Sequence, residues 1–492
     1  MSRIFVHYNN SHIAHSFEPG DRLLDLLQKW GCSIGAPCGG HGLCGKCKVT
    51  LKVGDELREV RACSTLLTED CEVFLPDDSR EPLWNSAQQA ENVGGGREGF
   101  GVAVDLGSTT VAMSLYNLNS GKEIGSTSRW NILKSYGADV ISRIGYCMEH
   151  TDGLDRLCRE QQAQILQMLS FLCAENAIPK EEIREGFLAG NTVMEHIFAK
   201  ISPASIAVAP YLPLSYFTAG EAVILEGIPF YLSPCVAGYL GGDITAGLLA
   251  AKICDSEKTS LFIDVGTNGE IVLGNKDGLN SCAVASGPAF EGAGISCGMP
   301  ALCGAIYRVF PRAGHLNFEV LGGGEAKGIC GSGLLDLLAC LLDLGYLDES
   351  GSLRGSREGR FYLTDSVYIS QRDIRQLQLA KAAIAAGITR LTETKKISFG
   401  DIDQLYLSGG FGSGIRSESA VRIGMLPEEL ADKVILLGNT SLSGAAQALL
   451  APSKRRELPE IKKKCAYLEL SSDIGFNDRF VEAMSFPEQK GN

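Results

Sequence analysis

The stretch Cys38-Gly-Gly-His-Gly-Leu-Cys44-Gly-Lys-Cys47 decides the fold of the first part of the chain. Its three thiols are separated by glycines, which let a backbone fold closely around a bound group and aim amides at it. Cysteine thiolates are the ligands of iron–sulfur clusters, and a 2Fe–2S centre needs four of them. The motif therefore predicts a 2Fe–2S cluster held by Cys38, Cys44, Cys47 and one later cysteine.

The fourth ligand is predicted to be Cys63, within Arg61-Ala62-Cys63-Ser64-Thr65. Cys71 is a weaker alternative because it falls in a hydrophobic strand pattern, and Cys32, six residues before the motif, is weaker still. Zinc also binds four cysteines, but structural zinc sites usually use paired C-x2-C knuckles. This chain has one such pair, Cys44 and Cys47, and five residues separate Cys38 from Cys44. This arrangement favours an iron–sulfur cluster over zinc. Most of the remaining cysteines, of 17 in all, are expected to be small buried apolar residues.

The residues around the motif predict a small mixed domain. Residues 4–17 alternate like a hairpin, a short helical pattern with leucines on one face follows, and strands are expected near 47–53 and 71–75. This order is that of a β-grasp domain. Residues 1–76 resemble ferredoxins of the plant and adrenodoxin class, and the five-residue spacer between the first two ligands is closer to the adrenodoxin form.

The rest of the chain predicts a linker and a large α/β body. Residues 77–99 are polar, contain three consecutive glycines and lack a packing pattern, which is typical of a linker. Residues 100–492 alternate strands with long helices. Similar strand–turn units at 101–116 and 261–273 indicate a duplicated architecture, with one α/β half built around each unit.

Two helices in this body are well marked. Gly331–Leu344 places leucines on one face, with Asp336 and Asp343 off that face, and Asp373–Leu391 shows a similar period. The glycines that open the first helix permit close packing, and Ser332 is predicted to cap it.

Three glycine loops that follow strand patterns predict nucleotide binding. Residues 104–110 read Val-Asp-Leu-Gly-Ser-Thr-Thr, and residues 263–270 repeat the device as Ile-Asp-Val-Gly-Thr-Asn-Gly-Glu. Each glycine gives a turn whose amides can meet phosphate, and each acid, Asp105 or Asp264, can hold Mg2+. Residues 407–414, Leu-Ser-Gly-Gly-Phe-Gly-Ser-Gly, offer flat backbone for an adenine and ribose.

The ordered set of loops predicts ATP as the ligand, with Mg2+. The predicted contacts are Gly107, Ser108, Thr109, Thr110, Gly266, Thr267, Asn268, Gly269, Gly331, Ser332, Gly333, Gly409, Gly410, Phe411 and Gly412. The set resembles the superfamily of actin, sugar kinases and heat-shock chaperones, which implies two RNase-H-like lobes that close on the nucleotide. No P-loop signature is present, so a P-loop fold is not expected.

The whole chain resembles the reductive activators of corrinoid proteins. The likeness is carried by residues 136–143 (YGADVISR), 190–194 (GNTVM), 209–213 (APYLP), 237–243 (AGYLGGD) and 286–292 (SGPAFEG). Spacing alone assigns no chemistry to these segments, whose plain interpretation is turns and packing. Two interpretations of Glu291 remain open: it could orient a water molecule, or it could be an exposed acid in a turn.

The resemblance implies a repair reaction on a corrinoid (cobalamin-binding) protein. One electron would pass from the 2Fe–2S centre to cobalt(II), giving cobalt(I), coupled to ATP hydrolysis. A plant-type cluster lies near about -400 mV, and for one electron each ~59 mV uphill costs tenfold in equilibrium, so a lower cobalt couple explains the need for ATP. The resemblance implies that Asp105 and Asp264 act catalytically, organising Mg2+ and the attacking water.

Composition limits the compartment and the partners. The net charge of -13 argues against nucleic acid as a partner. No apolar run reaches the ~20 residues that span a bilayer, and the opening residues lack the apolar core of a signal peptide, so we expect no membrane partner and a cytoplasmic protein. An electron-donor protein is an expected partner, and a homodimer is left open.

Three rival functions remain at this point. The chain could be an ATP-dependent electron activator of another low-potential enzyme, although the dehydratase activators use a 4Fe–4S cluster shared at a dimer interface. It could be a metabolite kinase with a fused redox domain, although no general base can be assigned. It could also be a chaperone-type module that uses ATP only to grip a partner.

Overall fold

The computed structural model describes residues 2–8, 11–30, 42, 47–54, 56–75, 96–312, 315–354, 358–409 and 414–488. These residues divide into two compact units. The first unit takes in the described residues up to Leu232 apart from 96–97 and Leu118–Lys122, and the second takes those two pieces and everything from Ser233 onward. The linker predicted at 77–99 falls largely outside the described residues, so the division into 1–76, 77–99 and 100–492 stays a prediction.

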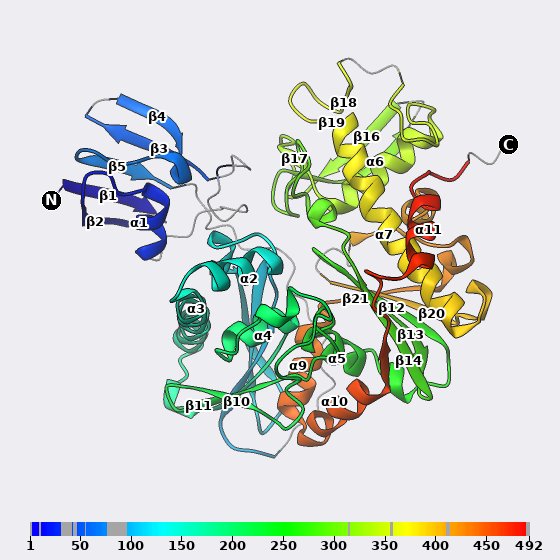
Figure 1. The fold of residues 1–492 in the computed structure, drawn as a ribbon, viewed down its shortest axis with the longest axis horizontal. Helices are drawn as coiled ribbons and strands as arrows, with labels where there is room; N and C mark the ends of the chain where they lie inside the picture. Colours follow the sequence, from blue (N-terminus) through cyan, green and yellow to red (C-terminus); the bar gives the residue numbers. More distant parts are fainter. Residues whose placement is uncertain are drawn as a thin grey trace. The chain divides into compact units, whose positions relative to one another are not determined.

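The N-terminal part of the first unit is a five-stranded sheet with one helix (Figure 1). The strand order is β2-β1-β5-β3-β4, with β1 (Ser2–Tyr8), β2 (Ser11–Phe17), β3 (Lys48–Val53), β4 (Glu56–Arg61) and β5 (Cys71–Phe74). The predicted hairpin and the other predicted strands are present, and β1 runs parallel to β5. Helix α1 (Leu23–Lys29) buries Leu23, Leu24 and Leu27 completely or almost so, as predicted.

Each unit contains a six-stranded sheet. The first has the order β10-β11-β9-β6-β7-β8, and the second has the order β21-β20-β12-β13-β14-β22. The first is built from β6 (Phe100–Leu106), β7 (Thr110–Asn117), β8 (Glu123–Trp130), β9 (Ile183–Gly190), β10 (Ala222–Leu225) and β11 (Ile228–Leu232). The second is built from β12 (Ser260–Val265), β13 (Gly269–Asn275), β14 (Gly278–Val284), β20 (Gln404–Ser408), β21 (Val434–Gly438) and β22 (Cys465–Tyr467).

The two sheets repeat one plan, which confirms the predicted duplication. In each, three antiparallel strands form a meander, and the first of them pairs in parallel with a later strand: β6 with β9, and β12 with β20. A further parallel strand, β11 or β21, extends each sheet. The loops predicted to bind phosphate therefore occupy the same place in both sheets, in the hairpin after the first strand.

Helices cover the sheets within each unit (Figure 1). The first unit contains α2 (Val140–Glu149), α3 (Gly153–Glu175) and α4 (Thr192–Phe198). The second contains α5 (Gly242–Ala250), α6 (Gly331–Asp343), α7 (Gln371–Lys395), α8 (Ser417–Arg422), α9 (Thr440–Leu450), α10 (Pro452–Lys464) and α11 (Ile474–Glu482). It also carries small sheets of β15 (Ala305–Arg312), β16 (His315–Val320) and β17 (Gly328–Ile329), and of β18 (Arg360–Tyr362) and β19 (Tyr368–Ser370). Both predicted long helices appear, as α6 and α7.

Asp336 of α6, predicted to lie off the leucine face, is buried, and Ser419 of α8 donates a hydrogen bond from its hydroxyl to the carboxylate. One prediction about this helix was wrong. Ser332 does not cap the helix, because the N-cap position is Cys330 and Ser332 lies inside the first turn. The Ser332 hydroxyl instead donates to the carbonyl of Tyr307 on β15, at 2.9 Å. In the part of the chain that the structure describes, no helix is long and apolar enough to cross a membrane.

Candidate functional site

The structure brings two of the four predicted cluster ligands together. The hairpin of β3 and β4 pairs Lys48 with Arg61, so the residues just outside that pair, Cys47 and Ala62, lie side by side. Cys63 follows in a 3-10 turn, and its backbone N–H donates to the Sγ of Cys47 at 3.5 Å. Backbone amides that donate to ligand sulfurs are a normal feature of iron–sulfur sites, so the residues present fit a cluster.

The structure favours Cys63 over Cys71 as the fourth ligand. Cys63 contacts the Sγ of Cys47 through its backbone amide, whereas Cys71 lies in β5 and pairs with Ile4 on β1. All three cysteines belong to the same apolar core. Burial, with Asp70 and Glu69 as the smaller causes, raises the pKa of the Cys71 thiol to about 11. Cys32, Cys38 and Cys44 lie outside the described residues.

The first phosphate loop, residues 105–110, joins β6 to β7. Asp105 is the penultimate residue of β6, opposite Ala112 on β7, and is half-buried. A Cβ on Gly107 would lie 2.7 Å from the carbonyl oxygen of Thr110, so only glycine fits this turn. The carbonyl of Gly107 accepts a hydrogen bond from the side-chain amide of Asn131 at 2.8 Å. The loop that carries Ser108, Thr109 and Thr110 is thus held by the residues behind it.

The second phosphate loop, residues 264–270, joins β12 to β13 in the second unit. The amide of Gly266 donates to the carbonyl of Asn268 at 2.9 Å, which closes a tight turn. The hydroxyl of Thr267 donates to Oε2 of Glu291 at 3.0 Å. Glu291 is half-buried, so it is not the exposed turn acid that remained an alternative from the sequence. A side chain on Gly269 would meet Val284 at 2.9 Å.

Acidic groups converge beside this loop. Asp264 and Glu270 are directly opposite across β12 and β13, so their side chains share one face of the sheet. Burial raises the pKa of Glu270 well above its ordinary value, and Asp243 at the start of α5 and Asp264 raise it further. Like charges this close are unfavourable, so the site suits a cation.

Magnesium fits this site with few direct protein ligands. Among the described residues, no group of three His, Cys, Asp or Glu side chains is placed to hold one ion. Mg2+ usually keeps several waters and is held by one or two carboxylates together with nucleotide phosphates. The chemistry of the second loop agrees with that arrangement, in which the nucleotide would complete the ion's coordination.

The third glycine loop meets Asp264 directly. The hydroxyl of Ser408, the last residue of β20, donates to Oδ2 of Asp264 at 2.9 Å and also contacts the hydroxyl of Thr440 at the start of α9. Gly409 follows with φ of +91°, and a Cβ there would lie 2.7 Å from Oδ1 of Asp264. The side chain of Asp264 thus connects the loop predicted to bind the nucleoside, residues 407–414, to the second phosphate loop, residues 264–270. Gly410, Phe411 and Gly412 lie outside the described residues.

The predicted contact at residues 331–333 packs against β15. A side chain on Gly333 would overlap the carbonyl oxygen of Ile306, which explains the glycine by close packing of α6 on β15. Gly331 begins α6 and is buried. The role of this segment in binding a nucleotide stays a prediction.

Two of the five segments that carry the resemblance contact the predicted phosphate loops. Residues 136–143 supply Arg143, whose guanidinium donates to the carbonyl of Ser108. Residues 286–292 supply Glu291, and the hydroxyl of Ser286 donates to the carbonyl of Thr267 at 3.5 Å. Sequence reasoning missed these roles because the supporting residues lie 19 to 35 positions from the loops.

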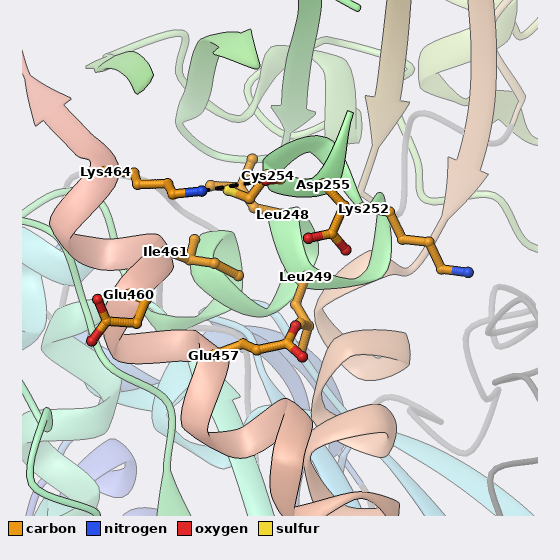
Figure 2. Close-up of a pocket in the computed structure, with 9 residues that line it drawn as sticks. All are labelled: Leu248, Leu249, Lys252, Cys254, Asp255, Glu457, Glu460, Ile461 and Lys464. Atoms are coloured by element: carbon orange, nitrogen blue, oxygen red, sulfur yellow. Dashed lines mark hydrogen bonds between the residues drawn. The ribbon is translucent and has the colours of Figure 1, made fainter. Parts of the chain in front are cut away.

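A separate cavity of about 100 Å³ lies between α5 and α10. Its lining combines the apolar side chains of Leu248, Leu249 and Ile461 with charged groups of both signs (Figure 2). The lining residues are Leu248, Leu249, Lys252, Cys254, Asp255, Glu457, Glu460, Ile461 and Lys464, none of which was predicted to bind a ligand. The cavity therefore shares no residue with the predicted cluster ligands and nucleotide contacts.

Models of known domain families match almost all of the chain. The 2Fe–2S iron–sulfur cluster binding domain matches residues 6–70. The middle region of RACo matches residues 100–256, and the C-terminal ASKHA domain of RACo matches residues 258–492.

Individual relatives agree with these matches. The corrinoid activation enzyme RamQ of Eubacterium limosum is 30% identical over 417 residues, covering 78% of this chain and 69% of RamQ. The reductase of the Co(II) methylated amine-specific corrinoid protein of Methanosarcina barkeri is 29% identical, covering 53% and 52%. A solved structure described as a reductive activator for corrinoid, iron–sulfur protein is 30% identical, covers 99% of both chains and superposes with a TM-score of 0.71.

Proposed function

The chain belongs to the family of reductive activators of corrinoid proteins, and we propose that it reduces the cobalt(II) of a corrinoid protein to cobalt(I) by one electron, coupled to ATP hydrolysis. The observation that carries this proposal is that one chain combines a cysteine pair arranged for a cluster with two equivalent phosphate loops. Its direct partners are the corrinoid protein, whose cobalt is the substrate, and an electron-donor protein.

The cysteines hold the electron-transfer centre. We assign Cys38, Cys44, Cys47 and Cys63 as its four ligands, of which Cys47 and Cys63 lie within the described residues. A bound 2Fe–2S cluster supplies the single electron. The amide of Cys63 donates to the Sγ of Cys47, which stabilises the thiolate, and the burial of both residues limits the access of water.

The nucleotide loops supply the ATPase. Asp105 and Asp264 are proposed to organise Mg2+ and the attacking water, and the amides and hydroxyls of the two loops to bind the phosphates. Ser408 donates to one oxygen of Asp264, so the carboxylate is oriented before the nucleotide arrives. We also propose that Glu291, which accepts a hydrogen bond from the hydroxyl of Thr267, positions this water. The cytoplasm is the proposed compartment, because ATP is supplied there and thiols are kept reduced there.

The decisive experiment follows the cobalt. The chain, reconstituted anaerobically with iron and sulfide, is mixed with a reductant, Mg·ATP and a purified cobalt(II) corrinoid protein, and the absorption spectrum is recorded. Conversion to cobalt(I) with ATP, and not with a non-hydrolysable analogue or without nucleotide, is the expected result. A spectrum that stays cobalt(II) under all three conditions would contradict the proposal, and a phosphorylated small product would identify a kinase instead.

A further inference from the structure

Arg143 of α2 is an unusual side chain. It is completely buried, and it is among the largest of the fully buried side chains in the described part of the chain. Its guanidinium makes three hydrogen bonds: from Nε to the carbonyl of Gly137 at 3.1 Å, from Nη1 to the Sδ of Met194 at 3.0 Å, and from Nη2 to the carbonyl of Ser108 at 2.5 Å. None of these three acceptors is charged, so a buried cation is held by neutral groups.

This arrangement is costly unless an anion compensates the charge. Burial lowers the pKa of Arg143 to about 10, while Asp139 acts in the opposite direction, so the side chain stays charged at neutral pH. Removing a charge from water without a charged partner is strongly unfavourable. The chain keeps this cation directly behind the first phosphate loop, which suggests that the compensating anion arrives with the nucleotide.

Arg143 and Asn131 together set the direction of the loop backbone. Asn131, also fully buried, donates from its side chain to the carbonyl of Gly107 at 2.8 Å and from its backbone to the carbonyl of Thr109 at 2.9 Å. Arg143 holds the carbonyl of Ser108 that lies between them. Three successive carbonyls are therefore fixed by the protein behind the loop.

Fixed carbonyls also fix amides. In a trans peptide the N–H of the next residue points opposite to the C=O. Holding the carbonyls of Gly107 and Ser108 therefore aims the N–H groups of Ser108 and Thr109 away from Asn131 and Arg143. Successive N–H groups that lie on one side of a turn can form an anion-binding nest. A guanidinium bonded to the carbonyl of Ser108 also polarises that peptide, which makes the amide of Thr109 a stronger donor.

We propose that Arg143 is the positioning residue of the first phosphate loop: with Asn131 it holds the amides of Ser108 and Thr109 toward the polyphosphate of ATP, and its buried charge is compensated by that polyphosphate. This inference rests on the proposed function, because it assumes that the loop binds ATP. Arg143 does not itself touch the nucleotide. It acts through the backbone of Ser108, so its effect depends on the phosphates and not on the adenosine.

The test measures affinity for ATP and for adenosine by equilibrium dialysis. Arg143→Lys keeps the charge but cannot reproduce a three-way fork, and Arg143→Met removes the charge. Asn131→Asp keeps the acceptor that caps the following turn through the amide of Leu133 and loses the donor to Gly107. The matched control is Arg159→Met, at an exposed position on α3.

The expected result is about tenfold weaker ATP binding in Arg143→Lys and Asn131→Asp, which corresponds to about 1.4 kcal/mol, a larger loss in Arg143→Met, and adenosine affinity within twofold of the parent. The control should bind both ligands normally. Variants that bind ATP as tightly as the parent, or that lose ATP and adenosine alike, would overturn the proposal, since the second pattern indicates a purely structural role.

A measurement on the unmodified chain decides the matter if the variants do not fold. Hydrogen exchange of the peptide spanning residues 106–111 should slow with Mg·ATP and change little with adenosine. Equal exchange with both ligands would overturn the role assigned to Arg143. Failure of the parent chain to bind ATP at all would instead count against the proposed function, so the two failures can be told apart.

Discussion

Gly409 is the residue at which backbone geometry and the magnesium site meet. Its φ of +91° is a conformation that side chains rarely adopt, and a Cβ would lie 2.7 Å from both Oδ1 of Asp264 and the carbonyl oxygen of Val265. A methyl group at this position must therefore move either the nucleoside loop or the carboxylate. Because both contacts belong to the site, the consequence should appear in ATP turnover before it appears in global stability.

We expect Gly409→Ala to lower ATP turnover at least tenfold and to destabilise the second unit by about 1–3 kcal/mol, the range for strained backbone. Steady-state ATPase assays and thermal melts provide the measurement. Gly278→Ala is the matched control, because Gly278 has open space where a Cβ would lie, and it should leave the ATPase unchanged. Normal turnover by Gly409→Ala would remove this loop from the site.

Glu291 shows how a single acid can be tested for chemistry apart from geometry. Glu291→Gln keeps an oxygen that can accept the hydrogen bond from Thr267, but it removes the negative charge that we propose orients a water. We expect turnover to fall about 100-fold, within the usual range for a lost acid–base group, with KM for ATP within twofold of the parent. Glu257→Gln, at an exposed acid paired with Lys276, should behave like the parent. A Glu291→Gln variant with full turnover would show that the acid only holds Thr267.

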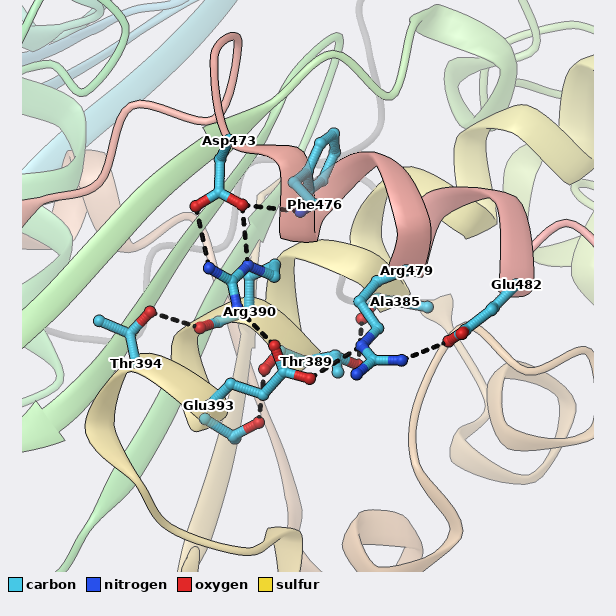
Figure 3. A network of polar contacts seen from close by, with 10 residues as sticks. Ala385, Thr389, Arg390, Glu393, Thr394, Asp473, Phe476, Arg479 and Glu482 are labelled. Carbon is cyan, nitrogen blue, oxygen red and sulfur yellow. Dashed lines mark hydrogen bonds and ion pairs between the residues drawn. The ribbon is translucent and has the colours of Figure 1, made fainter.

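At the scale of elements, the C-terminal helix α11 is fastened to α7 by a charged network (Figure 3). Arg390 of α7 makes two parallel hydrogen bonds to Asp473, at 3.0 and 2.9 Å, and also binds Glu393. Asp473 caps α11 by accepting from the amide of Phe476 at 2.7 Å. A two-pronged Arg–carboxylate pair of this kind is stronger than an ordinary surface ion pair.

The network predicts an acid-sensitive attachment of α11. The hydrogen bonds from Arg390 hold the pKa of Asp473 below its ordinary value of 3.8, so the stabilisation is present above that value and is lost as the pH falls through the lowered pKa. Asp473→Asn keeps the cap but loses the charge, and we expect it to lower the free energy of unfolding by about 1–3 kcal/mol at pH 7. Thermal melts between pH 7 and pH 3 should show the parent converging on the variant.

The control for α11 lies on the same helix. Glu482 pairs with Arg479 three residues earlier and is mostly exposed, so Glu482→Gln should change stability by less than about 0.5 kcal/mol. If Asp473→Asn were as stable as Glu482→Gln, or if the gap between the parent and Asp473→Asn did not depend on pH, the network would have no role in holding the helix.

Elements also show what the sequence could predict. Strands and helices with strong apolar patterns, such as β6, β12, β20, α6 and α7, were placed within a few residues. Strand β4 was missed because it is an edge strand with five of its six residues exposed or charged, so it carries no apolar alternation. Yet β4 is the element that brings Cys63 to Cys47. The cysteine motif predicted Cys63 as a cluster ligand. Only the pairing register of β3 and β4 shows how Cys63 comes to lie beside Cys47.

Long-range polar contacts were beyond the reach of periodicity. The periodicity placed Asp336 off the leucine face, but it could not show that the carboxylate is buried against Ser419, which lies 83 residues away. Arg143 and Asn131 likewise belong to local patterns that say nothing about a loop 24 to 35 residues earlier. The predicted site therefore contained the residues of the glycine loops and omitted Arg143 and Asn131, which hold the backbone of the first loop.

At the scale of the whole molecule, the chain combines a 2Fe–2S domain, which carries an electron, with an ATPase body. A driven reduction requires both. The reduction potential of the cluster is expected to lie above that of the cobalt(II)/cobalt(I) couple, so the cluster alone cannot drive the reaction, and ATP alone carries no electron. Since the cluster ligands and the phosphate loops share no residues, a variant that abolishes cluster binding should leave ATP binding intact, and a variant that abolishes ATP turnover should leave the cluster intact. The coupling would then appear only when both the cluster and the ATPase body are intact.

We therefore expect two single variants to fail in the overall reaction for different reasons. Cys63→Ser should lose the 2Fe–2S absorption and the reduced-state paramagnetic signal, yet bind ATP normally. Asp264→Asn should keep the cluster spectrum and lose at least about 100-fold in ATP turnover, because the carboxylate held by Ser408 can no longer organise Mg2+. Neither should produce cobalt(I), and mixing the two should restore it only if electrons pass between chains. Cys71→Ala is the control for the cluster and should keep its spectrum; if it lost the cluster while Cys63→Ser kept it, the fourth ligand would be Cys71, and the register of β3 and β4 would not be what builds the cluster site.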